Sequence, residues 1–325
     1  MKHLKKIFAL LLLANSFVVL NLHSKDDGRS IENVTFYSLK EEGSNERVQR
    51  NGILVLRPNA KATVLVLHGY TRDKHDAAPL RRMFLKNYNS FSFDFRAHGE
   101  NSYGQRSTMG HDEVFDVMAA VQYLKSRPEV RGKPLFVFAF SMGAATAIEA
   151  QSKNPYLFDA MFLDTPFHSS AQIIKNGVSK MHFNILGHKF NIPGACYLES
   201  LAFNDFCQPI IKFLLRLLST LDGFKVETHV KPIKPYESIK KINTPCHFVV
   251  CVNDKLVSYK DVVEVYSNHP STAKIWISDG RWHCDSLFND PEYYDEILNG
   301  FFEDVLNNRL KEGKEIVRSC LDEKE

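Results

Sequence analysis

Short apolar runs recur along the chain and alternate with segments of helical periodicity. Residues 63–67 form a continuous run of threonine, valine and leucine, which is typical of a strand buried on both faces of a sheet. Similar apolar runs predict further strands over residues 31–39, 53–56, 91–95, 135–140, 160–163, 247–252 and 273–277. This spacing leaves room for a helix between most consecutive strands.

Three segments have the periodicity of a helix. Residues 112–126 carry apolar side chains at helical spacing, and residues 144–150 are rich in alanine. A third helix follows Asp290, a suitable N-cap, and Pro291, which suits the first helical position. Strands that alternate with helices predict an α/β fold, with a mostly parallel central sheet and helices on both faces. Catalytic side chains in such folds lie at the carboxyl ends of the strands.

The bulk composition is that of a globular protein. The chain has 325 residues, of which 44% are hydrophobic and 24% charged. One α/β domain over residues 30–325, enlarged by an insertion, accounts for this length. The formal net charge is only +3 and there is no long basic block, so nothing in the sequence supports a nucleic-acid partner.

The first 24 residues differ from the rest. Lysines at positions 2, 5 and 6 precede an apolar run, and small residues follow at Ala14 and Ser16, in the order of a secretory signal. A second apolar run from Phe17 to Leu22 leaves open an uncleaved membrane anchor. Residues 1–24 therefore predict an exported protein that is periplasmic, secreted or membrane-anchored, rather than cytoplasmic.

The cysteines do not follow a metal-binding pattern. None of the six belongs to a C-x-x-C pair or to a Cys/His ligand spacing, so no metal site is expected. In an exported protein Cys196 and Cys207 are the best pair for a local disulfide, and two free thiols are the alternative.

Ser141 is the candidate nucleophile. It follows the apolar run 135–140 and precedes the alanine-rich helix, within the sequence Ala-Phe-Ser-Met-Gly. A serine on a sharp strand-to-helix turn exposes its hydroxyl, and the next backbone N–H can stabilise an oxyanion. Ala139 stands where the usual G-x-S-x-G pattern has glycine, a departure of one methyl group. A plain N-cap serine is the alternative interpretation.

A base and an acid follow Ser141 in the order that such a site requires. Asp254 comes just after the strand 247–252, and His283 follows the strand 273–277. Histidine can take the proton of a serine hydroxyl, and a carboxylate can orient the imidazole. The alternatives are a turn aspartate and a surface or core histidine. Because the three residues follow three different strand ends, we assign Ser141, His283 and Asp254 as a catalytic triad.

Two backbone N–H groups are candidates for the oxyanion hole. Met142 follows the nucleophile, and Tyr70 follows the strand end at His68-Gly69. We expect His68 to hydrogen-bond its own loop rather than act as a base. Asp94, Arg96 and His98 could resemble a second catalytic cluster, but we interpret them as a hydrogen-bonded scaffold for the loop beside the site.

These motifs together resemble the α/β-hydrolase superfamily. The chain contains His68-Gly69, the run Phe-Asp-x-Arg-x-His-Gly-x-x-Ser from residue 93, Ala-Phe-Ser-Met-Gly, Asn-Asp-x-Leu-Val and Gly-x-x-His in the expected order. It is similar to bacterial esterases, lysophospholipase-like and monoacylglycerol-lipase-like enzymes, and serine aminopeptidase-like relatives. The resemblance covers residues 50–160 and 240–310. It implies hydrolysis of an ester, thioester or amide without a cofactor, and the triad and oxyanion roles given above.

Residues 168–235 break the alternation of strands and helices and predict a cap over the site. Apolar positions between 210 and 221 have helical spacing, either as a lid over an acyl chain or as a helix packed on the core. With nearby aromatic residues, this segment predicts an ester or lipid substrate with an apolar or aromatic acyl group. The cap, like the N-terminal segment, could also contact a membrane.

Other functions use the same residues. An acyltransferase or a peptidase could employ the same triad with a different acceptor or substrate. A hydrolase-fold protein that only binds a ligand usually lacks a triad member, whereas this chain keeps all three. A serine esterase is therefore the favoured function from the sequence.

Overall fold

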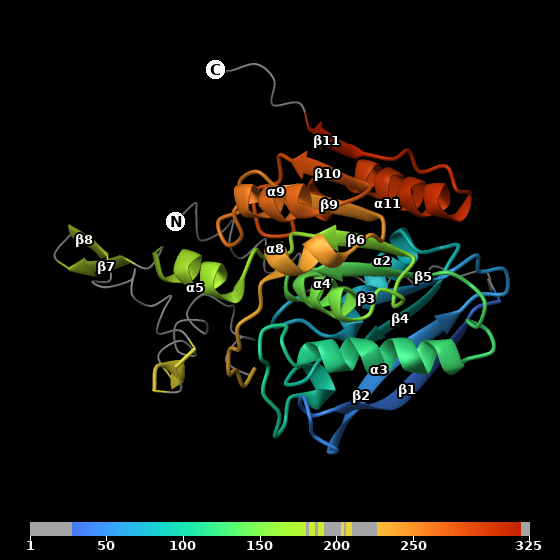
Figure 1. Ribbon diagram of the computed structural model, residues 1–325, viewed down its shortest axis with the longest axis horizontal. Coiled ribbons are helices and arrows are strands. Elements are labelled where there is room, and N and C mark those ends of the chain that lie inside the picture. The colour runs from blue at the N-terminus through green and yellow to red at the C-terminus, as the bar shows by residue number, and fades with distance from the viewer. Residues whose placement is uncertain are drawn as a thin grey trace, which may run out of the picture.

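A computed structural model of the protein describes residues 28–179, 182–185, 188–191, 203–204, 206–209 and 226–319 (Figure 1). Within these ranges nine strands form one sheet in the order β1-β2-β4-β3-β5-β6-β9-β10-β11. The strands β1 and β2 pair antiparallel, as do β2 and β4, and all other neighbours pair parallel. The mostly parallel sheet agrees with the fold class expected from the sequence.

The strands and helices have the following bounds. The strands of the sheet are β1 (Ser30–Leu39), β2 (Arg47–Leu56), β3 (Thr63–Leu67), β4 (Asn89–Phe93), β5 (Leu135–Phe140), β6 (Ala160–Asp164), β9 (Cys246–Cys251), β10 (Ala273–Ser278) and β11 (Lys314–Arg318). The helices are α2 (Ala77–Met83), α3 (Glu113–Ser126), α4 (Met142–Lys153), α5 (Ser170–Ser179), α8 (Pro235–Ser238), α9 (Tyr259–Asn268), α10 (Ser286–Asn289) and α11 (Pro291–Leu306). Short 3-10 turns span Lys74–Asp76, Gly99–Asn101 and Ile239–Lys241.

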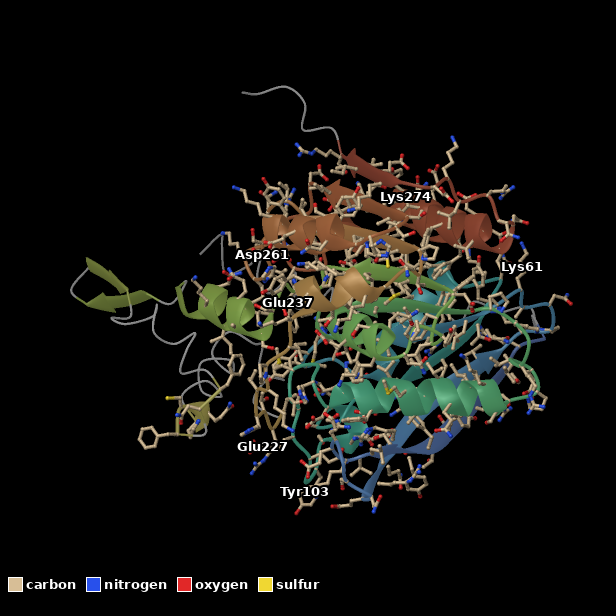
Figure 2. The ribbon with its side chains drawn as sticks, viewed as in Figure 1. Lys61, Tyr103, Glu227, Glu237, Asp261 and Lys274 are labelled. Atoms are coloured by element: carbon tan, nitrogen blue, oxygen red, sulfur yellow. The ribbon has the colours of Figure 1, made fainter. Side chains whose placement is uncertain are left out.

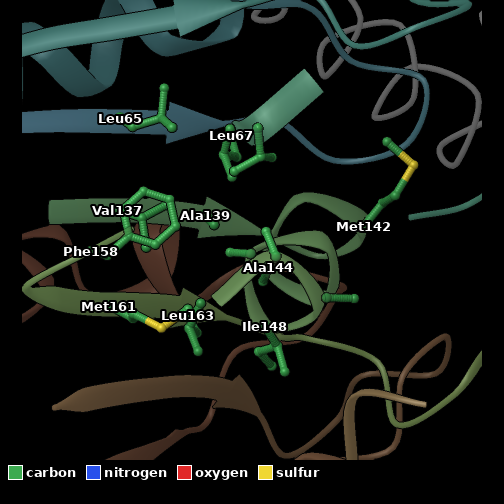
Figure 3. Close-up of a cluster of buried hydrophobic side chains, with 14 of the residues drawn as sticks. Leu65, Leu67, Val137, Ala139, Met142, Ala144, Ile148, Phe158, Met161 and Leu163 are labelled. Atoms are coloured by element: carbon green, nitrogen blue, oxygen red, sulfur yellow. The ribbon is translucent and has the colours of Figure 1, made fainter. Parts of the chain in front are cut away.

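Two apolar clusters cover the two faces of the sheet. One cluster joins the sheet to α3, α4 and α9, and the other joins it to α2 and α11. Figure 3 shows part of the first cluster, where Ala144 and Ile148 of α4 lie over side chains of β3, β5 and β6. Because β3 and β6 are buried along their whole length and β5 at all but its last residue, their sequences are nearly continuous apolar runs.

The main correction to the predicted strands concerns β4. The apolar run predicted a strand over residues 91–95, but β4 ends at Phe93, and Asp94 and Phe95 lie beyond it. The carboxylate of Asp94 accepts hydrogen bonds from the backbone N–H groups of Lys74 and Glu100, and the N–H of Phe95 donates to His68. The N–H of Asp94 still donates to the carbonyl of Asn51 in β2, and beyond it these side-chain partners take over as the chain leaves the sheet.

Several elements extend or add to the predicted set. The strand β2 begins at Arg47 rather than residue 53, because its polar first half pairs with β1. The helix α4 begins at Met142 and is therefore directly adjacent to Ser141. The helix α9 and the exposed edge strand β11 were not predicted.

Parts of the sequence-based predictions fall outside the described residues. These are residues 1–24, the apolar stripe between 210 and 221, and Cys196; Cys207 itself carries a free thiol. Within residues 168–235 the structure describes α5 and an antiparallel pair of strands, β7 (His182–Ile185) and β8 (His188–Asn191), which lie to one side of the sheet (Figure 1). None of the helices that the structure describes has the length and apolar content needed to cross a bilayer.

Candidate active site

Ser141 lies on the sharp turn between β5 and α4. Its backbone has φ 49° and ψ −114°, a strained conformation for a residue other than glycine. The N–H of Ser141 donates to the carbonyl of Asp164, with an N···O distance of 2.8 Å. Strain of this kind persists only where the surroundings determine it, and here the turn raises the hydroxyl above the carboxyl end of the sheet.

Gly143 explains why the turn needs a small residue after the serine. A Cβ at this position would lie 2.6 Å from the carbonyl oxygens of both Leu67 and His68. Both oxygens belong to the backbone at the end of β3, so neither can move aside easily. The close approach of β3 to the start of α4 therefore requires glycine.

We expect Gly143→Ala to lower the free energy of unfolding by about 1–3 kcal/mol, because the added methyl group must displace backbone. Gly300→Ala is the matched control: it lies within α11 with no atom of a neighbouring segment within 4 Å of the added Cβ. The control should be neutral, or more stable by up to about 1 kcal/mol, since alanine favours the helix. Urea denaturation of both variants measures this difference, and equal stabilities would contradict the steric argument.

His283 connects the serine to an aspartate. Its Nε2 lies 2.7 Å from the Oγ of Ser141, and its Nδ1 lies 2.7 Å from the Oδ2 of Asp254. The other carboxylate oxygen of Asp254 accepts the backbone N–H groups of Leu256 and Val257. Because a carboxylate can only accept, the proton lies on Nδ1, and Nε2 is left to accept from the hydroxyl.

The three side chains differ in their contact with solvent. The carboxylate of Asp254 is fully buried, whereas the side chain of His283 keeps 24% of its surface exposed. Ser141 as a whole is only 8% exposed. The protein thus encloses the carboxylate of Asp254, whereas the imidazole of His283 is in contact with solvent.

The loop after β3 passes next to the serine. A Cβ at Gly69 would lie 3.5 Å from the Cβ of Ser141, so the backbone that leads to Tyr70 runs beside the hydroxyl-bearing residue. Met142 is the first residue of α4, and its N–H therefore belongs to the helix turn that lacks intrahelical acceptors. Both residues that the sequence assigns to the oxyanion hole lie at this turn.

The side chain of Tyr70 contacts a residue near the C-terminal end of the insertion, residues 168–235. Its hydroxyl lies 2.6 Å from the Oγ1 of Thr228. Thr228 in turn lies beside Ser107 in a parallel bridge, and the hydroxyl of Ser107 contacts the sulfur of Met142 at 3.8 Å. The sequence gives no sign of these contacts, because Thr228 lies more than 150 residues from Tyr70.

His68 is occupied by its own loop. Its Nδ1 lies 2.7 Å from the carbonyl oxygen of Gly69, and its Nε2 accepts the backbone N–H of Phe95. Burial lowers the pKa of His68 to about 4, so the ring is neutral at physiological pH. With both ring nitrogens engaged, His68 acts as a structural link between two loops.

Asp94 and Arg96 also hold loops in place. Asp94 forms a buried ion pair with Lys74 at 2.7 Å. Arg96 donates to Asp116 of α3 and to the backbone carbonyls of Leu39 and Lys40. His98 follows them on the same loop, and its Nδ1 is 2.8 Å from the carbonyl of Arg96. These contacts describe a scaffold beside the site, away from the hydroxyl of Ser141.

Asp116 is the centre of this scaffold, and the sequence analysis missed it. It is fully buried and binds Arg96, the guanidinium of Arg50 and the hydroxyl of Ser38. Nε of Arg50 lies 2.8 Å from the carboxylate, although its N–H is not aligned for a hydrogen bond. Burial acts to raise the pKa of Asp116, but the two guanidinium groups outweigh it and lower the pKa to about 2.

Charged side chains at the surface, unlike that of Asp116, are in contact with solvent. Figure 2 shows Lys61, Glu237 and Lys274 at the surface of the molecule, where each forms an ion pair in contact with solvent. A possible signal for Asp116 was its position in α3 between the apolar residues Val114 and Val117, on the buried side of the helix. A charge at such a position requires a partner.

Comparison with known proteins places these motifs in context. The model of the family described as serine aminopeptidase, S33, matches residues 58–191, which include Ser141. Protein bem46 of Schizosaccharomyces pombe is 27% identical over 143 residues, or 42% of this chain. That match spans 47% of the yeast protein, about half of its length.

Solved structures share the fold across most of the chain. An esterase of Pyrococcus furiosus, Pf2001, has a TM-score of 0.62 at 23% identity, with 88% of this chain and 95% of the esterase covered. An acylaminoacyl peptidase of Pyrococcus horikoshii has a TM-score of 0.58 at 13% identity, with 86% of this chain and 42% of the peptidase covered. These comparisons support a hydrolase-fold enzyme of the esterase or peptidase type. By its sheet order and its strand-to-helix serine the chain has the α/β-hydrolase fold, and its residues 58–191 are similar to the serine aminopeptidase, S33, family.

Proposed function

We propose that the protein is a serine hydrolase that cleaves a carboxylic ester or thioester through an acyl-enzyme. The observation that carries this proposal is the chain of hydrogen bonds from Ser141 through His283 to Asp254, with both heavy-atom distances at 2.7 Å. A nucleophile, a base and an orienting acid within hydrogen-bonding distance are the requirement for activating a serine.

The chemistry follows from these contacts. The hydroxyl of Ser141 attacks the substrate carbonyl while Nε2 of His283 accepts its proton. Asp254 keeps the imidazole in the required tautomer and stabilises the imidazolium. The N–H groups of Tyr70 and Met142 donate to the oxyanion of the tetrahedral intermediate. His283 then protonates the leaving group, and water, activated by the same imidazole, releases the acid from Ser141.

An apolar or aromatic acyl group suits the surroundings of the serine. Tyr70 and Met142 border the turn, and Phe167 follows the neighbouring strand β6 in a buried position. These side chains make the surroundings of the serine apolar, which favours an apolar acyl group in the substrate. An esterase of Pyrococcus furiosus shares this fold, which is compatible with an ester substrate.

A peptidase is the second candidate. The S33 serine aminopeptidase model and the acylaminoacyl peptidase of Pyrococcus horikoshii favour it. Ester and amide hydrolysis use the same triad and differ in the leaving group. Turnover of p-nitrophenyl esters of several chain lengths, compared with amino-acid p-nitroanilides, separates the two candidates.

Labelling with a fluorophosphonate tests the proposed function directly. We expect the full-length protein to be labelled and Ser141→Ala to lose the label completely, because the probe forms a bond only with an activated serine. Ser152→Ala, at the far end of the same helix, should be labelled like the wild type. Labelling that persists in Ser141→Ala would refute the assignment of the nucleophile.

A further inference from the structure

A second buried carboxyl lies beneath the proposed triad. Asp164 is the last residue of β6 and is 0% exposed. Its backbone carbonyl accepts the N–H of Ser141 at 2.8 Å. Its side chain accepts the hydroxyl of Thr165 at one oxygen and the hydroxyl of Tyr294, from α11, at the other, both at 2.8 Å. The mechanism above uses none of these groups.

The surroundings of Asp164 also reach the histidine. Cys284 directly follows His283, and both Asp164 and the next residue, Thr165, lie close enough to influence the pKa of its thiol. Thr165 and Cys284 have φ values of 52° and 56°, in the left-handed region that residues other than glycine rarely adopt. Two strained residues on adjoining loops indicate a fixed geometry. Asp164 thus contacts the turn of the nucleophile through its backbone and lies next to the loop of His283, where its charge acts on the thiol of Cys284.

The charge of Asp164 is sensitive to pH. Burial raises its pKa to about 6, although the hydroxyls of Thr165 and Tyr294 and the charge of His283 favour the ionised form. The negative charge of Asp254, like burial, raises the pKa of Asp164. Among the described residues the phenol of Tyr294 and the thiols of Cys251 and Cys284 also lie beside it, and burial raises the pKa of each. Asp164 is therefore neutral below about pH 6 and negatively charged above it.

We propose that Asp164 is a positioning residue of this site, which holds the turn of Ser141 and the loop of His283 together and whose negative charge sets the acid limit of activity. This inference rests on the proposed function. A negative charge beside the imidazole favours the protonated imidazolium, which cannot accept a proton from Ser141. Removing that charge should therefore let Ser141 react at lower pH.

The pH dependence of fluorophosphonate labelling tests this proposal. The second-order rate constant for labelling of the full-length protein is measured from about pH 5 to about pH 9, so that its acid limb is resolved. In Asp164→Asn we expect the acid limb to move to lower pH by several tenths of a unit to about one unit. Tyr294→Phe should shift the acid limb in the same direction by a smaller amount, because it removes a hydrogen bond that stabilises the ionised carboxylate of Asp164.

A different buried carboxyl, that of Glu149, provides the control. Glu149 of α4 also has a pKa raised by burial, but it accepts from Lys234 and Ser238, away from His283. Glu149→Gln should leave the acid limb in place. Two results would overturn the role of Asp164. One is an acid limb that is unshifted in both Asp164→Asn and Tyr294→Phe, and the other is a labelling rate constant that falls by the same factor at every pH. If Asp164→Asn does not fold, the limb of Tyr294→Phe decides. A wild type that is never labelled would instead contradict the proposed function itself.

Discussion

Asp254→Asn is expected to lower kcat/KM by about ten-thousandfold while the protein stays folded. The asparagine can keep its oxygen on the N–H groups of Leu256 and Val257, which Asp254 accepts at 2.7 and 3.0 Å. Its amide then faces Nδ1 of His283 and donates to it. The imidazole proton moves to Nε2, and the hydroxyl of Ser141 loses its acceptor.

Steady-state kinetics with a p-nitrophenyl ester, together with thermal unfolding, measure this effect. Asp279→Asn is the matched control, because it makes the same change of charge on the neighbouring loop, where Asp279 is exposed and accepts from Asn289. The control should retain kcat/KM. Full activity in Asp254→Asn with an unchanged melting temperature would show that His283 needs no carboxylate.

Asp116→Asn is expected to reduce the free energy of unfolding at neutral pH by about 3–5 kcal/mol. The substitution leaves the guanidinium groups of Arg50 and Arg96 buried without their shared counter-charge. Solvent cannot compensate, because the side chain of Arg50 is fully buried and that of Arg96 is 5% exposed. The loss should be measurable by urea denaturation.

The stability lost in Asp116→Asn should also depend on pH. The folded-state pKa of Asp116, about 2, lies below the ordinary value of 3.8, so its stabilisation is present above pH 3.8 and is lost as the pH falls toward 2. Wild type and Asp116→Asn should therefore converge in stability at low pH. Asp304→Asn, which breaks a partly exposed pair with Arg309 at 3.5 Å, should cost less than about 1 kcal/mol. A loss for Asp116→Asn no greater than for Asp304→Asn would contradict the buried network.

Burial decided which strands could be predicted from the sequence. The strands β3, β5, β6, β9 and β10 are buried on both faces, so their composition alone marks them. The first half of β2 is polar and the edge strand β11 is largely exposed, so neither has an apolar pattern. The helix α9 did carry a readable signal, namely Ser258 as N-cap and the buried positions Val262, Val265 and Tyr266.

The candidate site was predictable where chain order determines position. Ser141, Asp254 and His283 follow three different strands, and parallel strands bring their carboxyl ends to one edge of the sheet. The supporting contacts were not predictable. Asp164 resembles an ordinary turn aspartate before Thr165 and Pro166, and only tertiary packing brings Tyr294 to it.

The direct pairing of β6 with β9 has a consequence for how such an enzyme can diversify. Met161 lies opposite Cys246 in this pair, although the long insertion separates them in the sequence. Because the two strands are parallel, the intervening segment leaves the carboxyl end of β6, beside the site, and crosses back to the amino end of β9, so its length and composition can change between these fixed points without displacing the residues at the strand ends. Substrate selectivity can therefore evolve by exchange of that segment, while the reacting groups keep their geometry.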